Sequence, residues 1–140
     1  MKILLAVDGS SYTKHMLAFL AARPELLGGD RTYTAMTVVP ALPPHVTRFL
    51  PNGVETAYYD EQAQQVLKPV QAFAVQLGWS MELRHAVGVP GDAIAEAASA
   101  GKYDLVVLGS HGHGALSSMV LGSVAARVIA QCKAPVLLVR

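Results

Sequence analysis

The chain has 140 residues, of which 52% are hydrophobic and 15% carry a charge, and its formal net charge is +1. A chain of this length can bury a sizeable core, so we expect one domain over residues 1–140. The near-neutral charge argues against binding to nucleic acid, and no apolar run approaches the length that spans a membrane.

The single cysteine, Cys132, excludes a disulfide within the chain and fits a reducing compartment. Its place on the apolar face of a predicted helix is typical of a buried structural thiol rather than of a nucleophile. The short apolar stretch at the N-terminus ends at Asp8, without the small-residue cleavage site of a signal peptide. We therefore expect a cytoplasmic protein.

Strand and helix patterns alternate along the whole chain. Continuous apolar or β-branched runs predict most of the strands, a less clean alternation predicts the strand over residues 81–87, and apolar residues three and four positions apart predict helices. In chain order the predicted elements are strand 3–7, helix 11–22, strand 32–39, helix 60–77, strand 81–87, helix 92–100, strand 105–108, helix 122–132 and strand 136–139. This order predicts an α/β fold, an open five-stranded parallel sheet with helices on both faces.

Two proline-containing segments interrupt the pattern. Residues 40–53 contain four prolines and Gly53, which predicts a long loop. Pro69 lies inside the helical pattern 60–77, where it either kinks the helix or begins a second segment.

Two glycine clusters flank the segment between strand 105–108 and helix 122–132. Gly109 and Gly112 follow the strand, and Gly122 with Ser123 begins the helix. Glycines allow a sharp turn and a close approach of the backbone to a ligand, and the free N–H groups at a helix start favour phosphate. The alternative is a flexible loop with Ser123 as a helix cap.

Standard motifs of other phosphate-binding and hydrolytic proteins are absent from this segment. No lysine lies between Gly122 and Ser123, as the Walker A motif requires, and the sequence G-x-G from Gly112 to Gly114 does not continue to the third glycine of a dinucleotide fingerprint. The G-x-S-x-G elbow of hydrolases is also missing.

With its flanking blocks, the glycine segment resembles the universal stress protein family over essentially the whole chain. The blocks are Val-Asp-Gly-Ser at 7–10, Val-Gly-Val-Pro at 87–90, the stretch 103–112, Leu-Gly-Ser-Val-Ala at 121–125 and the stretch 134–139. The family's ATP-binding subclass carries G-x2-G-x9-G-[S/T], which Gly109, Gly112, Gly122 and Ser123 satisfy. The resemblance implies a Rossmann-like fold of the adenine nucleotide alpha hydrolase-like kind.

The resemblance also implies site residues for ATP, ADP or AMP. Asp8 would lie near the ribose and adenine, and the Val38 main chain would meet the adenine edge; the alternatives are a turn or capping aspartate and an ordinary core valine. Ala6 and Val7 would line the corner next to Asp8. The phosphate loop would comprise Gly109, Ser110, His111, Gly112, His113 and Gly114, and its far end Gly122, Ser123 and Val124.

Two histidines in this loop could form an H-x-H metal site, but no third ligand stands at a standard spacing. We expect His111 and His113 to be exposed or to hydrogen-bond phosphate, and Ser117 and Ser118 to face solvent. A magnesium or manganese ion would then sit on the phosphates rather than on protein ligands.

The loop departs from many relatives because residues 113–121 contain no lysine or arginine. We therefore expect modest ATP affinity and at most weak ATP hydrolysis, since no cationic clamp for the γ-phosphate is visible. The function implied by the resemblance is nucleotide binding with a regulatory role in stress response. Alternatives are a slow ATPase in which His111 or His113 orients water, or an interaction module whose segment 40–60 responds to nucleotide.

The predicted last strand is apolar and lies at a sheet edge, where it invites pairing unless it is covered. The resemblance implies that two copies pair here antiparallel about a two-fold axis. We expect a homodimer built on Val136, Leu138 and their neighbours.

Overall fold

A computed structural model describes residues 1–114, 118 and 120–140. One parallel sheet has the order β3-β2-β1-β4-β5 and consists of β1 (Lys2–Ala6), β2 (Thr32–Val39), β3 (Met81–Val87), β4 (Leu105–Gly109) and β5 (Val136–Val139). The helices of the described residues are α1 (Ser11–Ala21), α2 (Pro44–Thr47), α3 (Val54–Gln76), α4 (Pro90–Ala100) and α5 (Ser123–Gln131). The predicted α/β fold is therefore confirmed.

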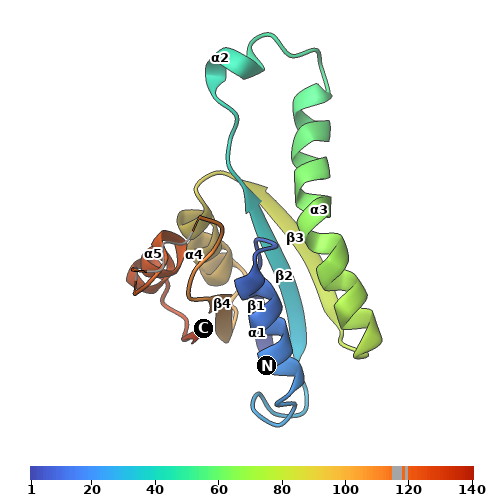
Figure 1. The fold of residues 1–140 in the computed structure, drawn as a ribbon, viewed down its shortest axis with the longest axis vertical. Helices are drawn as coiled ribbons and strands as arrows, with labels where there is room; N and C mark the ends of the chain where they lie inside the picture. Colours follow the sequence, from blue (N-terminus) through green and yellow to red (C-terminus); the bar gives the residue numbers. More distant parts are fainter. Residues whose placement is uncertain (115–117, 119) are drawn as a thin grey trace.

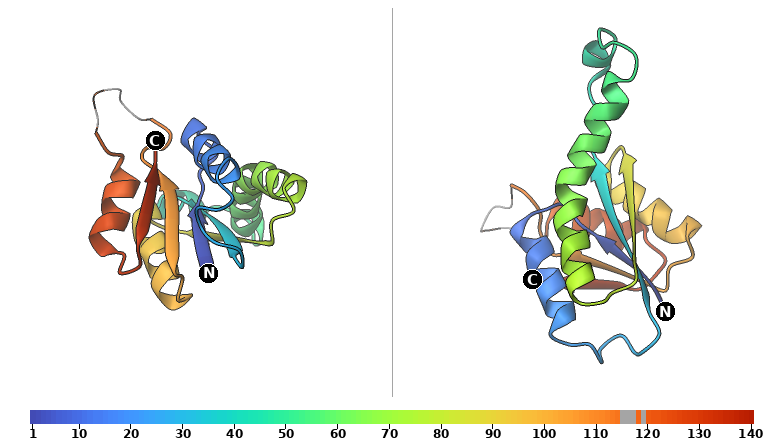
Figure 2. Two further views of the ribbon diagram at one scale, coloured as in Figure 1. Left: turned by 90° about the horizontal axis from the view of Figure 1, so that it is seen from below. Right: turned by 90° about the vertical axis from the view of Figure 1, so that its right-hand side faces the viewer.

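The helices lie on both faces of the sheet, with α1 and α3 on one side and α4 and α5 on the other (Figure 2). This layering follows from strands that are apolar on both faces. Ile3 and Leu5 pack in the core beneath α1 and α3, whereas Leu4 between them packs beneath α4 and α5. All three side chains are fully buried.

Helix α3 differs from its predicted form. It begins at Val54 rather than at residue 60, and it continues through Pro69 as one helix, so a second segment beginning there was the wrong alternative. Leu67, Val70 and Ala74 on either side of the proline are buried. Burial of this face stabilises the helix enough to offset the hydrogen bond that Pro69 cannot donate.

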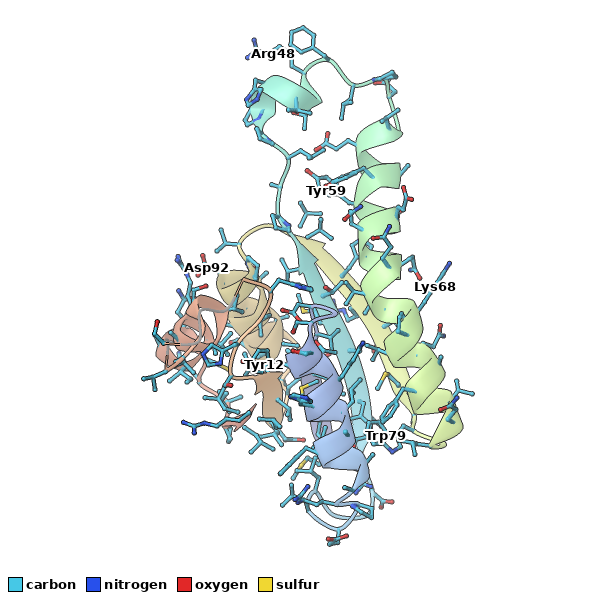
Figure 3. All side chains as sticks on the ribbon, viewed as in Figure 1. Tyr12, Arg48, Tyr59, Lys68, Trp79 and Asp92 are labelled. Carbon is cyan, nitrogen blue, oxygen red and sulfur yellow. The ribbon has the colours of Figure 1, made fainter. Side chains whose placement is uncertain are left out.

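The predicted loop 40–53 contains the short helix α2. With the first turns of α3 it forms an arm, residues 40–60, that projects beyond the carboxyl ends of the strands (Figure 1). Tyr59 braces the arm: its hydroxyl accepts a hydrogen bond from the Leu42 N–H at 2.8 Å and donates one to Glu55 Oε1 at 3.2 Å. Figure 3 shows Tyr59 on the side of α3 that faces the segment leading to α2.

Strand β5 lies at one edge of the sheet, as predicted. Its inward carbonyls are those of Pro135 and Val139, which accept hydrogen bonds from Val106 and Ser110. Because backbone groups alternate in direction along a strand, the N–H and C=O groups of Val136 and Leu138 point toward the free edge. Among the described residues, no helix is long and apolar enough to cross a membrane.

Candidate functional site

A cavity of about 600 Å³ opens where β1 and β4 end side by side. The chain leaves these two strands toward opposite sides of the sheet, and such a switch point is the usual ligand crevice of an open α/β sheet. All the predicted site residues except Ser110 line this cavity: Ala6, Val7, Asp8, Val38, Gly109, His111, Gly112, His113, Gly114, Gly122, Ser123 and Val124.

Ser110 does not line the cavity but holds the loop through hydrogen bonds of its main chain. It is buried, and its N–H donates to the Val139 carbonyl at 2.9 Å. Its own carbonyl accepts a hydrogen bond from the Gly122 N–H at 2.7 Å. This hydrogen bond joins the two glycine clusters, so Ser110 and Gly122 lie next to each other.

Close approach explains why glycine stands at the glycine positions of the motif, and at Gly109 a Cβ would lie 2.6 Å from Tyr12 Cβ. A Cβ on Gly112 would overlap with Asp8 Oδ2. A Cβ on Gly122 would lie 3.0 Å from His111 Cα and 3.1 Å from the Ser110 carbonyl oxygen. Both contacts are with atoms that are held in place, so a side chain at either position would displace the loop.

The N-terminus of α5 faces the cavity with its first backbone amides. Gly122 is the N-cap, and Ala126 is the first residue whose N–H bonds back to it, at 2.9 Å. The amides of Ser123, Val124 and Ala125 therefore have no acceptor inside the helix, and all three residues line the cavity. Ser123 is the first helical residue and Gly122 is the N-cap, so the alternative in which Ser123 caps the helix was wrong.

Asp8 has a structural role in addition to its place in the cavity wall. Its Oδ1 accepts hydrogen bonds from the Ser10 N–H and from Thr13 Oγ1, both at 2.9 Å. Burial raises the pKa of Asp8, but the hydrogen bonds from Ser10 and Thr13 and the nearby His113 outweigh burial, and the pKa lies below its ordinary value. The carboxylate is thus ionised near neutral pH, with Oδ2 directed toward Gly112.

The two loop histidines occupy different surroundings. His113 is exposed, and its Nε2 lies 2.8 Å from the main-chain carbonyl of Asp8, across the crevice. A carbonyl only accepts, so this nitrogen carries the hydrogen. His111 is half-buried, with Nδ1 3.0 Å from Ser110 Oγ and its ring 5.1 Å from that of Tyr12.

The main chain of Val38 is available to a ligand. The carbonyl of Met36 accepts a hydrogen bond from the N–H of Val7, directly after β1, and that of Val39 accepts one from Gly88, directly after β3. The alternation of the backbone therefore directs the N–H and C=O of Val38 toward the β1 side, beyond the point where β1 ends at Ala6. These two groups form an adjacent donor and acceptor at the cavity.

Apolar residues next to Val38 form a slot that the sequence did not reveal. Ala6 is paired with Met36 on one side and with Leu108 on the other, which brings three small or apolar side chains to the end of the sheet. Ile94 of α4 and Ala125 of α5 complete the slot. Their helical positions mark them only as core residues, so no sequence signal separates them from the rest of the core.

The rest of the cavity lining comes from α3 and from residues beside the predicted ones. Apart from Pro90, which ends the block at 87–90, none of these belongs to a motif, although their positions directly after strands or on a neighbouring helix are consistent with a shared edge. They are Thr13, Thr37, Val39, Pro40, Gln62, Gln65, Val66 and Pro90.

The charges around the cavity are few. No lysine or arginine is among the described residues that line it. No group of three histidine, cysteine or acidic residues suited to a metal ion occurs in the described part of the chain. Ser118 is exposed, as predicted, whereas Ser117 lies outside the described residues.

Comparisons with known proteins agree with this architecture. The model of the universal stress protein family matches residues 1–140. A universal stress protein of Thermus aquaticus, encoded in the 3′ region of a sulfhydrylase gene, is 35% identical over 143 residues, covering 99% of this chain and 97% of the relative.

Solved structures share the fold. The structure of the Methanocaldococcus jannaschii protein MJ0577 superposes with a TM-score of 0.79 at 24% identity, covering 99% of this chain and 94% of that one. A universal stress protein from Archaeoglobus fulgidus, solved in complex with dAMP, has a TM-score of 0.67 at 24% identity and covers 100% and 98%. The chain belongs to the universal stress protein family.

Proposed function

We propose that the cavity binds an adenine nucleotide and that the protein acts as a nucleotide-binding regulator in stress response. The observation that carries the proposal is the convergence of three groups in one cavity. These are the donor–acceptor pair of Val38, the apolar slot beside it, and the glycine loop with the free amides of α5. Each group suits a different part of one nucleotide.

The three groups fit the parts of a nucleotide in order. The slot around Ala6 takes the flat faces of the base, while the Val38 N–H and C=O pair with adenine N1 and N6. The Asp8 carboxylate accepts hydrogen bonds from ribose hydroxyls. The amides of Ser123 and Val124 and the backbone of the glycine loop hold the phosphates.

Relatives with the same fold support the choice of adenine. Universal stress proteins have been solved in complex with dAMP, AMP and cAMP. For a triphosphate, a magnesium or manganese ion would be held by the phosphate oxygens, since the described cavity offers Asp8 but no cluster of three ligands.

We expect modest affinity, because the described residues that line the cavity offer the phosphates backbone dipoles and histidines but no lysine or arginine. Calorimetric titration with AMP, ADP and ATP, the last with and without Mg²⁺, measures this. Dissociation constants in the micromolar range or weaker are expected, and sub-micromolar binding would contradict the argument.

The same absence of a cationic clamp favours binding over hydrolysis. Phosphate release from ATP by the wild type and by a His111→Ala/His113→Ala variant tests this. We expect little or no turnover in either protein; turnover that disappears in the variant would instead support the slow ATPase.

The proposed function itself is tested by denaturing freshly purified protein and separating the released small molecules by chromatography, together with the titrations above. An adenine nucleotide in the released fraction, or saturable binding of AMP or ATP, is the expected result. No released nucleotide and no binding of any of the three would overturn the proposal.

A further inference from the structure

Two glutamines on α3 face the cavity and have no hydrogen-bond partner among the described residues. Gln62 and Gln65 are three positions apart, so they lie on one face of the helix, and both line the cavity. Gln62 is half-buried. Neither side chain hydrogen-bonds to another described residue, in contrast to Gln131, which donates to Asp92 Oδ1 at 2.7 Å.

The position of α3 places these amides across the cavity from the apolar slot and from the amides of α5. Helix α3 covers the face of the sheet opposite α5, whose amides would hold phosphate. Val66, the next residue of the same wall, approaches the turn after β1 and lies 3.5 Å from where a Cβ on Gly9 would be. Val39 and Pro40, directly after Val38, line the cavity as well.

When adenine pairs with the main chain of Val38, a second polar edge of the ring remains without a partner. The Val38 N–H and C=O use N1 and one hydrogen of the N6 amino group. The other N6 hydrogen and the acceptor N7 remain, and a carboxamide matches this pair, since its oxygen accepts from N6 and its nitrogen donates to N7.

We infer that Gln62 reads the N6/N7 edge of the adenine ring and that the more exposed Gln65 flanks it. Gln62 is then a specificity-determining residue, which completes the recognition of adenine that Val38 begins. This inference rests on the proposed function, because it needs the base to lie at Val38.

The experiment compares AMP with 7-deaza-AMP, which lacks only the N7 acceptor. Titrations are made with the wild type, Gln62→Leu, Gln62→Glu and Gln64→Leu. Gln64 is the matched control, a glutamine of the same helix that is exposed and does not line the cavity. Side-chain amide resonances of the wild type are followed in the same titrations.

The wild type and Gln64→Leu are expected to prefer AMP over 7-deaza-AMP by about tenfold. Gln62→Leu should lose this preference, and the Gln62 side-chain NH2 resonance should shift with AMP but not with 7-deaza-AMP. If Gln62→Leu does not fold, Gln62→Glu carries the test, because its carboxylate cannot donate to N7 and should remove the same preference.

The results distinguish failure of this inference from failure of the proposed function. Equal binding of the two ligands by the wild type, or an undiminished preference in the Gln62 variants, overturns the inference while nucleotide binding stands. Failure of the wild type to bind AMP overturns the proposed function.

Discussion

Gly112 is a residue of the site that leaves no room for a side chain. An added Cβ would overlap with Asp8 Oδ2, whose carboxylate is itself fixed by Ser10 and Thr13. We expect Gly112→Ala to weaken AMP binding by at least about tenfold, because the loop must move away from the turn after β1. Calorimetric titration measures the affinity.

The matched control is Gly29→Ala, since a Cβ at Gly29 would meet nothing within 4 Å. This variant should bind AMP as the wild type does. Unchanged affinity in Gly112→Ala would show that the approach of Gly112 to Asp8 is not needed for the site.

Asp8 should make folding stability depend on pH. Its pKa is lowered in the folded protein, so its contribution is present above the unfolded value of about 3.9 and is lost as the pH falls through the folded pKa. Urea unfolding of the wild type and Asp8→Asn, measured between about pH 6 and about pH 3, isolates this contribution. The difference in unfolding free energy should shrink toward the acid end; a difference independent of pH would contradict the lowered pKa.

The arm depends on one hydroxyl. Tyr59→Phe removes the acceptor of the Leu42 N–H and the donor to Glu55. We expect hydrogen exchange at the Leu42 amide to be faster by roughly fivefold to tenfold, because one hydrogen bond contributes about 1 kcal/mol, while core amides of β1 change little. The control is Tyr58→Phe on the same helix, which should leave Leu42 unchanged; equal exchange in both variants would contradict the role of Tyr59.

Strands β1, β2, β4 and β5 were predictable from sequence because each is a continuous apolar or β-branched run, whereas β3 showed only a less regular alternation, with Met81, Leu83 and Ala86 half-buried and the other residues exposed. The arm was not. Residues 54–59 lack the apolar spacing of a buried helix, and α3 starts there because Tyr59 packs and bonds across to Leu42. Continuity through Pro69 was also beyond the sequence, since it depends on how much of Leu67 and Val70 the sheet buries.

The site residues also fall into two groups, those that the sequence located and those that it missed. The glycines and Ser123 have fixed spacing, and Asp8 follows a strand, so the sequence located them. The α3 wall was missed because only the packing angle of a long helix determines which of its turns reaches the cavity. Gln62 and Gln65 therefore look like ordinary surface residues in the sequence.

For the whole molecule, the free edge of β5 predicts pairing between two copies. The N–H groups of Val136 and Leu138 point away from β4 and have no strand beside them in a single chain. In the homodimer we expect, these amides are protected from hydrogen exchange as strongly as those of β4, and light scattering gives the mass of two chains. Rapid exchange at both amides together with a monomer mass would contradict pairing through this strand.

The central claim is that the end of the sheet between β1 and β4 holds an adenine nucleotide. Titration of AMP into ¹⁵N-labelled protein, followed by amide chemical shifts, tests it most directly. We expect saturable shifts at Val38, at residues 109–114, and at Ser123 and Val124, with little change on the outer face of α3. No saturable shift, or shifts confined to residues outside the cavity, would contradict it.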